Sequence, residues 1–134
     1  MKVKEFMKTK LAYIDADSTV YEAIEEMLDK RIRSLVVNPE NAEEVYGVIT
    51  ARDVVFKVLG KGLMPRDVKV SEIASKPVVC IDQDTKLIDA AVLMEKLGIA
   101  RLFVCEGKKL LGIFTLTDAM GGSLILIARS GHVA

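Results

Sequence analysis

The sequence lacks several features that would point to a particular partner. Basic and acidic residues balance at 19 each, so the formal net charge is zero, and neither nucleic acid nor an anionic membrane is expected as a partner. The longest apolar run, Leu124 to Ala128, is far too short to cross a bilayer. The opening stretch, MKVKEFMKTK, has no apolar core like that of a signal peptide. We therefore expect a soluble cytoplasmic protein.

Residues that bind metals or attack substrates are also few. The single histidine, His132, cannot complete a metal site of usual spacing. Two cysteines, Cys80 and Cys105, lie within the apolar runs VVCI and LFVCE, and we interpret both as small buried apolar side chains. The sequence offers no nucleophile–base pair, metal cluster or phosphate-binding glycine loop. An enzyme is therefore not expected.

What the sequence does contain is an internal repeat. The phrase GVITARD at residues 47–53 returns as GIFTLTD at residues 112–118. The first half of the chain aligns with the second half well beyond this phrase. The first loop, NPENAEEVY, is two residues longer than its counterpart, CEGKKLL. Insertions in repeats usually fall in loops, as this one does. Matching pairs include Val3 and Val70, Ile14 and Ile81, Ala23 and Ala90, Met27 and Met94, and Leu35 and Leu102.

Each repeat predicts the order strand, helix, strand, strand, helix. Short extended runs at 11–15 and 78–82 precede helices in which Ser18 or Thr85 can serve as the N-cap. These helices run to about Lys30 and Leu97, with apolar residues at helical spacing. The remaining elements are buried hairpins at SLVVN with VYGVIT and at RLFVCE with KLLGIFT, and closing helices at ARDVVFKVL and LTDAMGGSLILIA.

The fold class predicted from this order is α/β (α+β). One repeat of about 60 residues has too little core to be secure alone, so we expect the two repeats to pack sheet to sheet with pseudo-twofold symmetry. The predicted boundaries are 1–60 for the first repeat, 61–67 for a linker, 68–128 for the second repeat and 129–134 for a tail.

The repeated phrase carries a Thr-x-x-Asp spacing with two explanations. Thr50 and Asp53, like Thr115 and Asp118, fall where a strand is predicted to become a helix, so each pair can be a capping box worth about 1 kcal/mol. The same geometry also suits a ligand, because a helix N-terminus and a threonine hydroxyl can hold phosphate and an aspartate can accept from two ribose hydroxyls. The preceding glycine permits a close backbone approach. Spacing alone leaves both explanations open.

The full pattern resembles a tandem pair of CBS domains, often called a Bateman module. The resemblance rests on the duplicated plan, the helix starts IDADSTVYEAI and IDQDTKLIDAA, and the closing stretches GVITARDV and GIFTLTDAM. It implies two clefts related by a twofold axis, which in that family commonly bind AMP, ADP, ATP or S-adenosylmethionine. The family's aspartate holds the ribose, the Thr or Ser three residues before it holds phosphate, and adenine lies between apolar strand residues of both repeats.

Carried onto this sequence, the resemblance predicts two clefts that are not equivalent, since Thr117 of the second repeat stands where the first has Arg52. One cleft would use Thr50, Asp53 and Val48, with adenine against Val79 and Ile99. The other would use Thr115, Thr117, Asp118 and Ile113, with adenine against Ala12 and Ile32.

Two arginines, Arg33 and Arg101, begin the strands that follow the first helices, where family members often place a basic residue facing phosphate. Their columns differ, because Arg101 aligns with Ser34 and Arg33 with Ala100. Each can contact phosphate, worth roughly 1.5–3 kcal/mol, or be a solvated arginine or part of a salt bridge. One arginine per repeat favours a ligand of low charge, such as AMP, over a triphosphate.

Four aspartates could be taken for metal ligands, but aspartate is also common where strands end and helices begin, and we interpret them in that way. They are Asp15, Asp17, Asp82 and Asp84.

The resemblance implies a regulatory binding module rather than an enzyme. It would sense an adenosine nucleotide, AMP first and then ADP or ATP, as a regulatory ligand with no required cofactor. It would form a homodimer through helical faces and signal to a regulated partner that the sequence does not identify. The alternatives are a sensor of S-adenosylmethionine, or a dimerisation or scaffold protein with unoccupied clefts.

Overall fold

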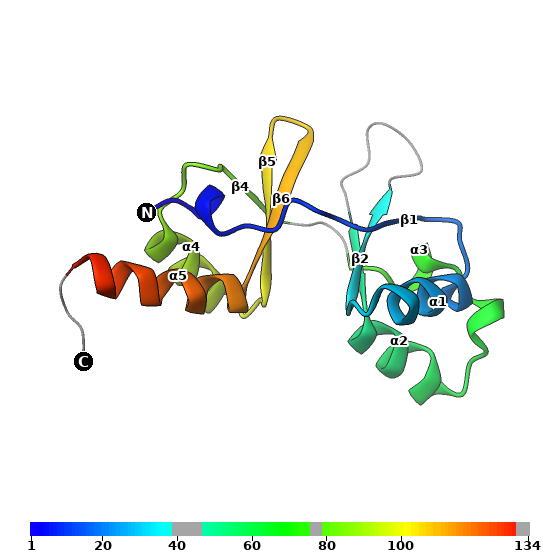
Figure 1. Ribbon diagram of the computed structural model, residues 1–134. Helices are drawn as coiled ribbons and strands as arrows, with labels where there is room; N and C mark the ends of the chain where they lie inside the picture. The colour runs from blue at the N-terminus through cyan, green and yellow to red at the C-terminus, as the bar shows by residue number, and fades with distance from the viewer. Residues whose placement is uncertain (39–46, 76–78, 131–134) are drawn as a thin grey trace. The chain divides into compact units, whose positions relative to one another are not determined.

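The computed structural model describes residues 1–38, 47–75 and 79–130 (Figure 1). By its contacts the chain divides into two compact units. We call Leu11–Val78 the central unit, and Met1–Lys10 together with Val79–Ala134 the split unit. Each unit is described by itself.

The central unit has a three-stranded sheet in the order β1-β2-β3, with β1 parallel to β2 and β2 antiparallel to β3. A buried cluster that includes Ala23 and Met27 of α1 and Leu35 and Val37 of β2 forms its core. The elements are β1 (Tyr13–Asp15), α1 (Val20–Lys30), β2 (Ser34–Asn38), β3 (Gly47–Thr50), α2 (Ala51–Lys57), the short 3-10 helices η2 (Leu59–Lys61) and η3 (Pro65–Asp67), and α3 (Val70–Ile73).

The split unit repeats this plan, with sheet order β4-β5-β6 and the same parallel and antiparallel pairings. Its core contains the matching residues Ala90, Met94, Leu102 and Val104. The elements are η1 (Val3–Glu5), β4 (Cys80–Ile81), α4 (Leu87–Leu97), β5 (Arg101–Glu106), β6 (Lys109–Thr115) and α5 (Leu116–Arg129). The predicted mixed α/β fold with two repeats is therefore confirmed. The packing of sheet on sheet and the pseudo-twofold axis stay predictions.

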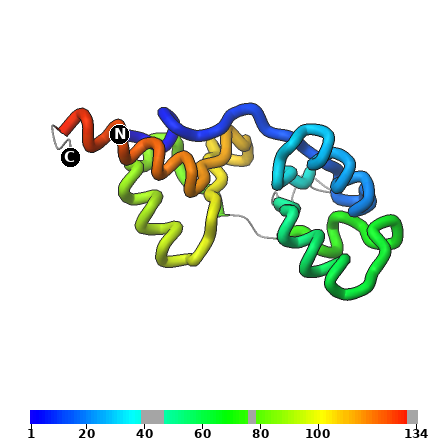
Figure 2. The backbone as a smooth tube through the Cα atoms, turned by 60° about the horizontal axis from the view of Figure 1, so that its bottom comes forward, coloured from blue at the N-terminus to red at the C-terminus, as the bar shows by residue number. Residues whose placement is uncertain are grey.

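The opening segment of each repeat packs in the body of the other repeat. Val3 is fully buried in the core of the split unit, and its backbone N–H donates to the Thr85 carbonyl at 2.9 Å. Its counterpart, Val70, is fully buried in the central unit and donates to the Ser18 carbonyl at 2.8 Å. Figure 2 shows the blue N-terminal segment beside the later elements of the split unit. The division by sequence repeat and the division by contact differ because of this exchange.

The N-caps of α1 and α4 lie one residue later than predicted. Thr19, not Ser18, is the N-cap of α1, and its hydroxyl oxygen accepts from the Glu22 backbone N–H at 3.1 Å. Lys86, not Thr85, is the N-cap of α4 and gives no side-chain cap. Both predicted caps are therefore wrong. The carbonyls of Ser18 and Thr85 instead accept from the exchanged segments, which places these residues in backbone pairing just ahead of the helices.

The predicted hairpin strands SLVVN, RLFVCE and KLLGIFT match β2, β5 and β6 at both ends. The predicted insertion at 39–46, the first residue of the predicted strand at 78–82, and His132 lie outside the described residues. Among the helices that the structure describes, none has the length and apolar character needed to traverse a membrane.

The interpretation of the two cysteines as buried apolar side chains is wrong. Cys80 is exposed, Cys105 is partly exposed, and the two are joined in a disulfide within the split unit. Cys80 lies on the two-residue edge strand β4, and Cys105 follows the irregularity in the pairing of β5 with β6. An apolar run does not bury every side chain of a short edge strand, because successive side chains point to opposite faces.

Candidate functional site

The Thr-x-x-Asp box of the central unit joins β3 to α2. Thr50 is the N-cap of α2, and its hydroxyl oxygen accepts from the Asp53 backbone N–H at 3.1 Å. Asp53 Oδ2 accepts in return from the Thr50 backbone N–H at 2.9 Å and from the Thr50 hydroxyl at 3.0 Å. The capping-box explanation is therefore confirmed for this pair.

The box of the split unit has the same geometry at the junction of β6 and α5. Asp118 Oδ2 accepts from the Thr115 backbone N–H at 2.8 Å and from its hydroxyl at 2.9 Å. The Asp118 backbone N–H donates to Thr115 Oγ1 at 3.4 Å. The box thus fixes one carboxylate oxygen of each aspartate and orients the other oxygen, Oδ1, away from the cap.

A lysine ammonium holds this second oxygen in each unit. Lys57 Nζ lies 3.0 Å from Asp53 Oδ1, and Lys8 Nζ lies 2.9 Å from Asp118 Oδ1. The aspartate side chains are only 10% and 11% exposed, whereas the lysine side chains are 47% and 55% exposed. Ion pairs with such exposed partners contribute little to stability, so ligand hydroxyls can replace the ammonium at Oδ1.

The two lysines reach the boxes from different elements. Lys57 is on α2 itself, four residues after Asp53, and its ammonium also donates to the Ile73 carbonyl at 2.9 Å. Lys8 belongs to the exchanged N-terminal segment, and its ammonium also donates to Thr115 Oγ1 at 3.1 Å. The split unit therefore has a cation between both side chains of its box.

The strands beside the boxes carry the matching positions of the two repeats. Arg101 pairs with Thr115 across β5 and β6, as Ser34 pairs with Thr50 across β2 and β3. Lys8 forms a backbone bridge with Ile113, as Ser75 does with Val48. The first arginine, Arg33, precedes β2, and its carbonyl accepts from the Ala51 backbone N–H at 2.9 Å.

The predicted site residues divide between the units. Ala12, Ile32, Arg33, Val48, Thr50 and Asp53 belong to the central unit, and Val79, Ile99, Arg101, Ile113, Thr115, Thr117 and Asp118 belong to the split unit. Each predicted cleft combines a box with adenine contacts of the other unit, so these combinations stay predictions. Within the central unit, Ala12 and Ile32 pack against the core that also contains Val54 of α2.

Ile99 lines an apolar hollow of about 340 Å³ within the split unit, between α4 and the start of α5. Leu116 and Ala119 of α5 line it too, directly beside the box residues Thr115 and Asp118 in the chain. Val79 lies elsewhere in the unit, where its carbonyl accepts from the Phe103 backbone N–H at 3.0 Å. Of the two predicted adenine contacts in this unit, Ile99 is the one that lines this hollow.

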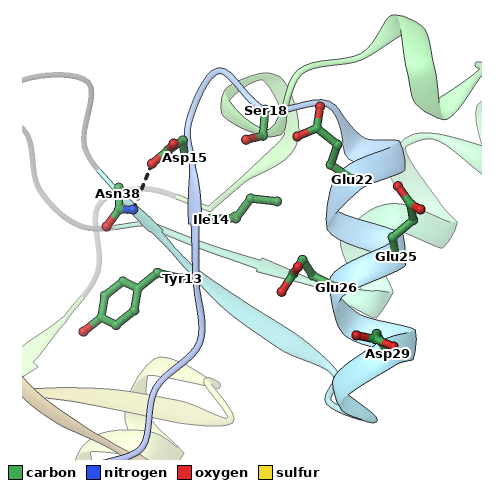
Figure 3. Close-up of a pocket in the computed structure, with 9 residues that line it drawn as sticks. All are labelled: Tyr13, Ile14, Asp15, Ser18, Glu22, Glu25, Glu26, Asp29 and Asn38. Carbon is green, nitrogen blue, oxygen red and sulfur yellow. Dashed lines mark hydrogen bonds between the residues drawn. The ribbon is translucent and has the colours of Figure 1, made fainter.

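A larger pocket of about 670 Å³ lies on the central unit and contains no predicted site residue (Figure 3). Figure 3 shows carboxylates of α1 facing it, and Asp15 accepting a hydrogen bond from Asn38 at 3.0 Å. Because carboxylates repel phosphate, this pocket does not suit a nucleotide. Its acidic residues are Asp15, Glu22, Glu25, Glu26 and Asp29.

The four aspartates that could be taken for metal ligands lie between the first strand and the first helix of each repeat, as we interpreted them: Asp15 ends β1, Asp82 follows β4, and Asp17 and Asp84 lie in turns. Asp82 Oδ1 accepts from the Asp84 backbone N–H at 2.7 Å. Hydrogen bonds from Lys4 and then Lys2 lower the pKa of Asp84 and tie it to the N-terminal segment. In the part of the chain that the structure describes, no three of the His, Cys, Asp and Glu residues are placed to hold a metal ion.

Sequence reasoning missed Lys8 and Lys57 as partners of the boxes. Lys8 and Ser75 are 67 residues apart, the same separation as Val3 and Val70, so they occupy matching positions of the repeats, and the structure places both beside the strand that leads into a box. A difference of one charge at matching positions was the available signal. Lys57 stands four residues after Asp53, which is the spacing of a helical ion pair.

The CBS domain matches the chain twice, over residues 3–60 and 70–123. The chain belongs to the CBS-domain family. The two matches form a tandem CBS pair, in general a regulatory ligand-binding module, and they explain why the Thr-x-x-Asp box occurs twice.

Similar proteins come from several kinds of organism. An uncharacterized protein of Methanopyrus kandleri is 36% identical over 111 residues, covering 82% of this chain and 56% of that protein. The uncharacterized protein YlbB of Bacillus subtilis is 30% identical over 117 residues, covering 87% of this chain and 78% of that protein. The structure of a hexameric CBS-CP12 protein from bloom-forming cyanobacteria has a TM-score of 0.85 at 32% identity, covering 94% of this chain and 73% of that chain. The chain thus spans little more than half the length of the first relative.

Proposed function

We propose that this CBS pair is a cytoplasmic regulatory module that binds an adenosine nucleotide, AMP before ADP or ATP, at its Thr-x-x-Asp boxes. Binding would shift the populations of its conformations, and a regulated partner protein would respond to the shift. The module would bind the nucleotide without turning it over and would need no further cofactor.

The observation that carries the proposal is that the two carboxylate oxygens of each aspartate have different partners. One oxygen is fixed by the threonine, which orients the carboxylate, and the other faces an exposed lysine ammonium that can be exchanged. A ribose offers two hydroxyl donors for that oxygen, and the displaced ammonium of Lys8, which also donates to Thr115 Oγ1, is then available to a phosphate. S-adenosylmethionine brings a sulfonium cation instead of phosphate, so this lysine favours a nucleotide over it.

The first prediction concerns the aspartates. Asp53→Ala and Asp118→Ala should each weaken AMP binding about tenfold or more at the altered site, because hydrogen bonds to a charged group are lost. The double variant should show no measurable heat in calorimetry with AMP, ADP or ATP. The wild type should first be freed of co-purified nucleotide.

Asp84→Ala is the matched control, because Asp84 is an aspartate of the split unit outside the box and its side chain is 53% exposed. It should bind AMP like the wild type. Circular dichroism must show folded protein in every variant, since losing a capping box alone costs about 1 kcal/mol. Unchanged AMP affinity in the double variant, or no heat from clean wild type, would contradict the proposal. The second result would favour a scaffold with unoccupied clefts.

We also propose that the module forms a homodimer through its helical faces. Four apolar side chains form an exposed stripe on α5, since their spacing places them on one face of the helix. A stripe of this kind is typical of an interaction surface. Its residues are Leu116, Met120, Leu124 and Ile127, with exposed fractions of 52%, 64%, 70% and 44%.

The second prediction tests this stripe. Met120→Lys combined with Leu124→Lys should convert a dimer to a monomer in analytical ultracentrifugation, because two charges would have to be buried at the interface. Leu28→Lys on α1 is the matched control, since Leu28 is 74% exposed and lies outside the stripe. A wild type that sediments as a monomer, or a double variant that remains a dimer, would contradict this interface.

A further inference from the structure

We propose that the half-site of the split unit selects phosphorylated nucleosides over nucleosides, and that Lys8 is the residue that determines this selection. The inference rests on the proposed function and adds to it a difference between the two boxes. We define the split half-site as Lys8, Arg101, Thr115 and Asp118, and the central half-site as Ser75, Ser34, Thr50 and Asp53. These are matching positions of the two repeats.

The backbone makes the comparison direct. Lys8 exchanges backbone hydrogen bonds with Ile113 at 2.8 and 2.9 Å, and Ser75 exchanges them with Val48 at 2.9 and 3.3 Å. Ile113 and Val48 each stand two residues before the threonine of a box. The same backbone position therefore carries a cation in the split half-site and a neutral hydroxyl in the central one.

The strand register adds a second positive charge to the split half-site and none to the central one. Arg101 lies directly across from Thr115, whereas Ser34 lies across from Thr50. Side chains of directly opposed residues on adjacent strands lie on the same face of a sheet. Two basic residues therefore flank the threonine of the split half-site, and two serines flank that of the central half-site.

The contacts of Lys8 show why its charge selects phosphate. Its ammonium bonds both Asp118 Oδ1 and Thr115 Oγ1, the two atoms proposed for ribose and phosphate. Ribose hydroxyls at Oδ1 would displace the ammonium from the carboxylate while leaving it beside the threonine. A phosphate there restores the lost ion pair, whereas a nucleoside without phosphate leaves the ammonium without a counter-ion.

The lysine of the central half-site does not take this role. Lys57 donates to the Ile73 carbonyl and to Asp53, so its second bond holds it on the side of α3 rather than at the hydroxyl of Thr50. If ribose hydroxyls displace Lys57 from Asp53, the ammonium still donates to the Ile73 carbonyl. The central half-site should therefore distinguish AMP from adenosine much less.

The test measures the ratio of adenosine to AMP dissociation constants in full-length protein carrying Asp53→Ala, which leaves the split half-site to be observed alone. Adding Lys8→Met should weaken AMP about tenfold or more and leave adenosine unchanged or tighter, because Asp118 loses its competitor. Lys8→Arg should keep the preference for AMP. Lys10→Met, the same loss of charge two residues along the segment, should leave the ratio within about twofold, since exposed charges at a distance are screened.

A converse variant tests the matching position. In the Asp118→Ala background, Ser75→Lys should raise the AMP preference of the central half-site. An unchanged ratio in Lys8→Met, in protein that binds AMP and is folded by circular dichroism, would overturn the inference and leave the proposed function standing. A wild type that binds neither AMP nor adenosine would overturn the proposed function, and this inference with it.

Discussion

Replacing both cysteines with serine should lower the free energy of unfolding by about 3 kcal/mol relative to the oxidised protein. The disulfide joins Cys80 and Cys105, which are separated by 25 residues, and so restricts the unfolded chain between them. It also ties β4, which pairs with β5 through only two residues, to the rest of its sheet. Urea unfolding followed by circular dichroism measures the difference.

Reduction supplies the control for this prediction. A thiol reductant should bring the wild type to the stability of the double serine variant and should leave the variant unchanged. Equal stability of the oxidised wild type and the variant would contradict it, as would two titratable thiols in protein prepared without reductant. Disulfides are uncommon in the cytoplasm outside hyperthermophiles, so thiol titration directly after cell lysis also tests the predicted compartment.

Gly112→Ala should lower the free energy of unfolding by about 2 kcal/mol, because a side chain at this position has no room. An added Cβ would lie 2.7 Å from the Lys8 carbonyl oxygen and 2.9 Å from Met7 Sδ. The nearer atom is backbone, so the N-terminal segment itself must move. Its pairing with Ile113 would open and carry Lys8 away from Asp118, so the AMP preference of the split half-site should fall as well.

Gly121→Ala is the matched control for Gly112→Ala. Gly121 lies within α5, and an added Cβ there meets no atom within 4 Å. Alanine is the better helix former by about 1 kcal/mol, so this variant should be slightly more stable than the wild type. Equal stability of Gly112→Ala and the wild type would show that the N-terminal segment is free to shift at no cost.

Much of the fold could be predicted because repetition makes local patterns visible twice. Apolar residues at helical spacing predicted α1 and α4. The hairpin strands were predicted from apolar runs that occur at matching positions of both repeats. The boxes were predicted as both cap and site, and the structure confirms the cap. The glycine before each box was expected to permit a close backbone approach at a ligand site; in the structure the backbone of Lys8 lies close to Gly112, and the approach of a ligand stays a prediction.

The features that were missed depend on contacts between distant parts of the chain. The partners of Lys8 are 107 and 110 residues away, so no local pattern around MKTK indicates an ion pair with Asp118. The disulfide was missed for a related reason. An apolar run reports the average burial of a strand, whereas the pairing of Cys80 with Cys105 depends on which side chains the edge strand leaves exposed.

The exchange of opening segments also sets an order of events during translation. The described core and the box of the central unit are built from residues within Leu11–Val78, so both can close once this stretch has left the ribosome. Val3 and Lys8 are synthesised earlier, but Val3 pairs with Thr85, and Lys8 with Ile113, Thr115 and Asp118, all of which follow Val79. The cation of the split half-site is thus among the first residues made and among the last to be placed. A nascent chain halted between the two boxes would carry the serine half-site alone.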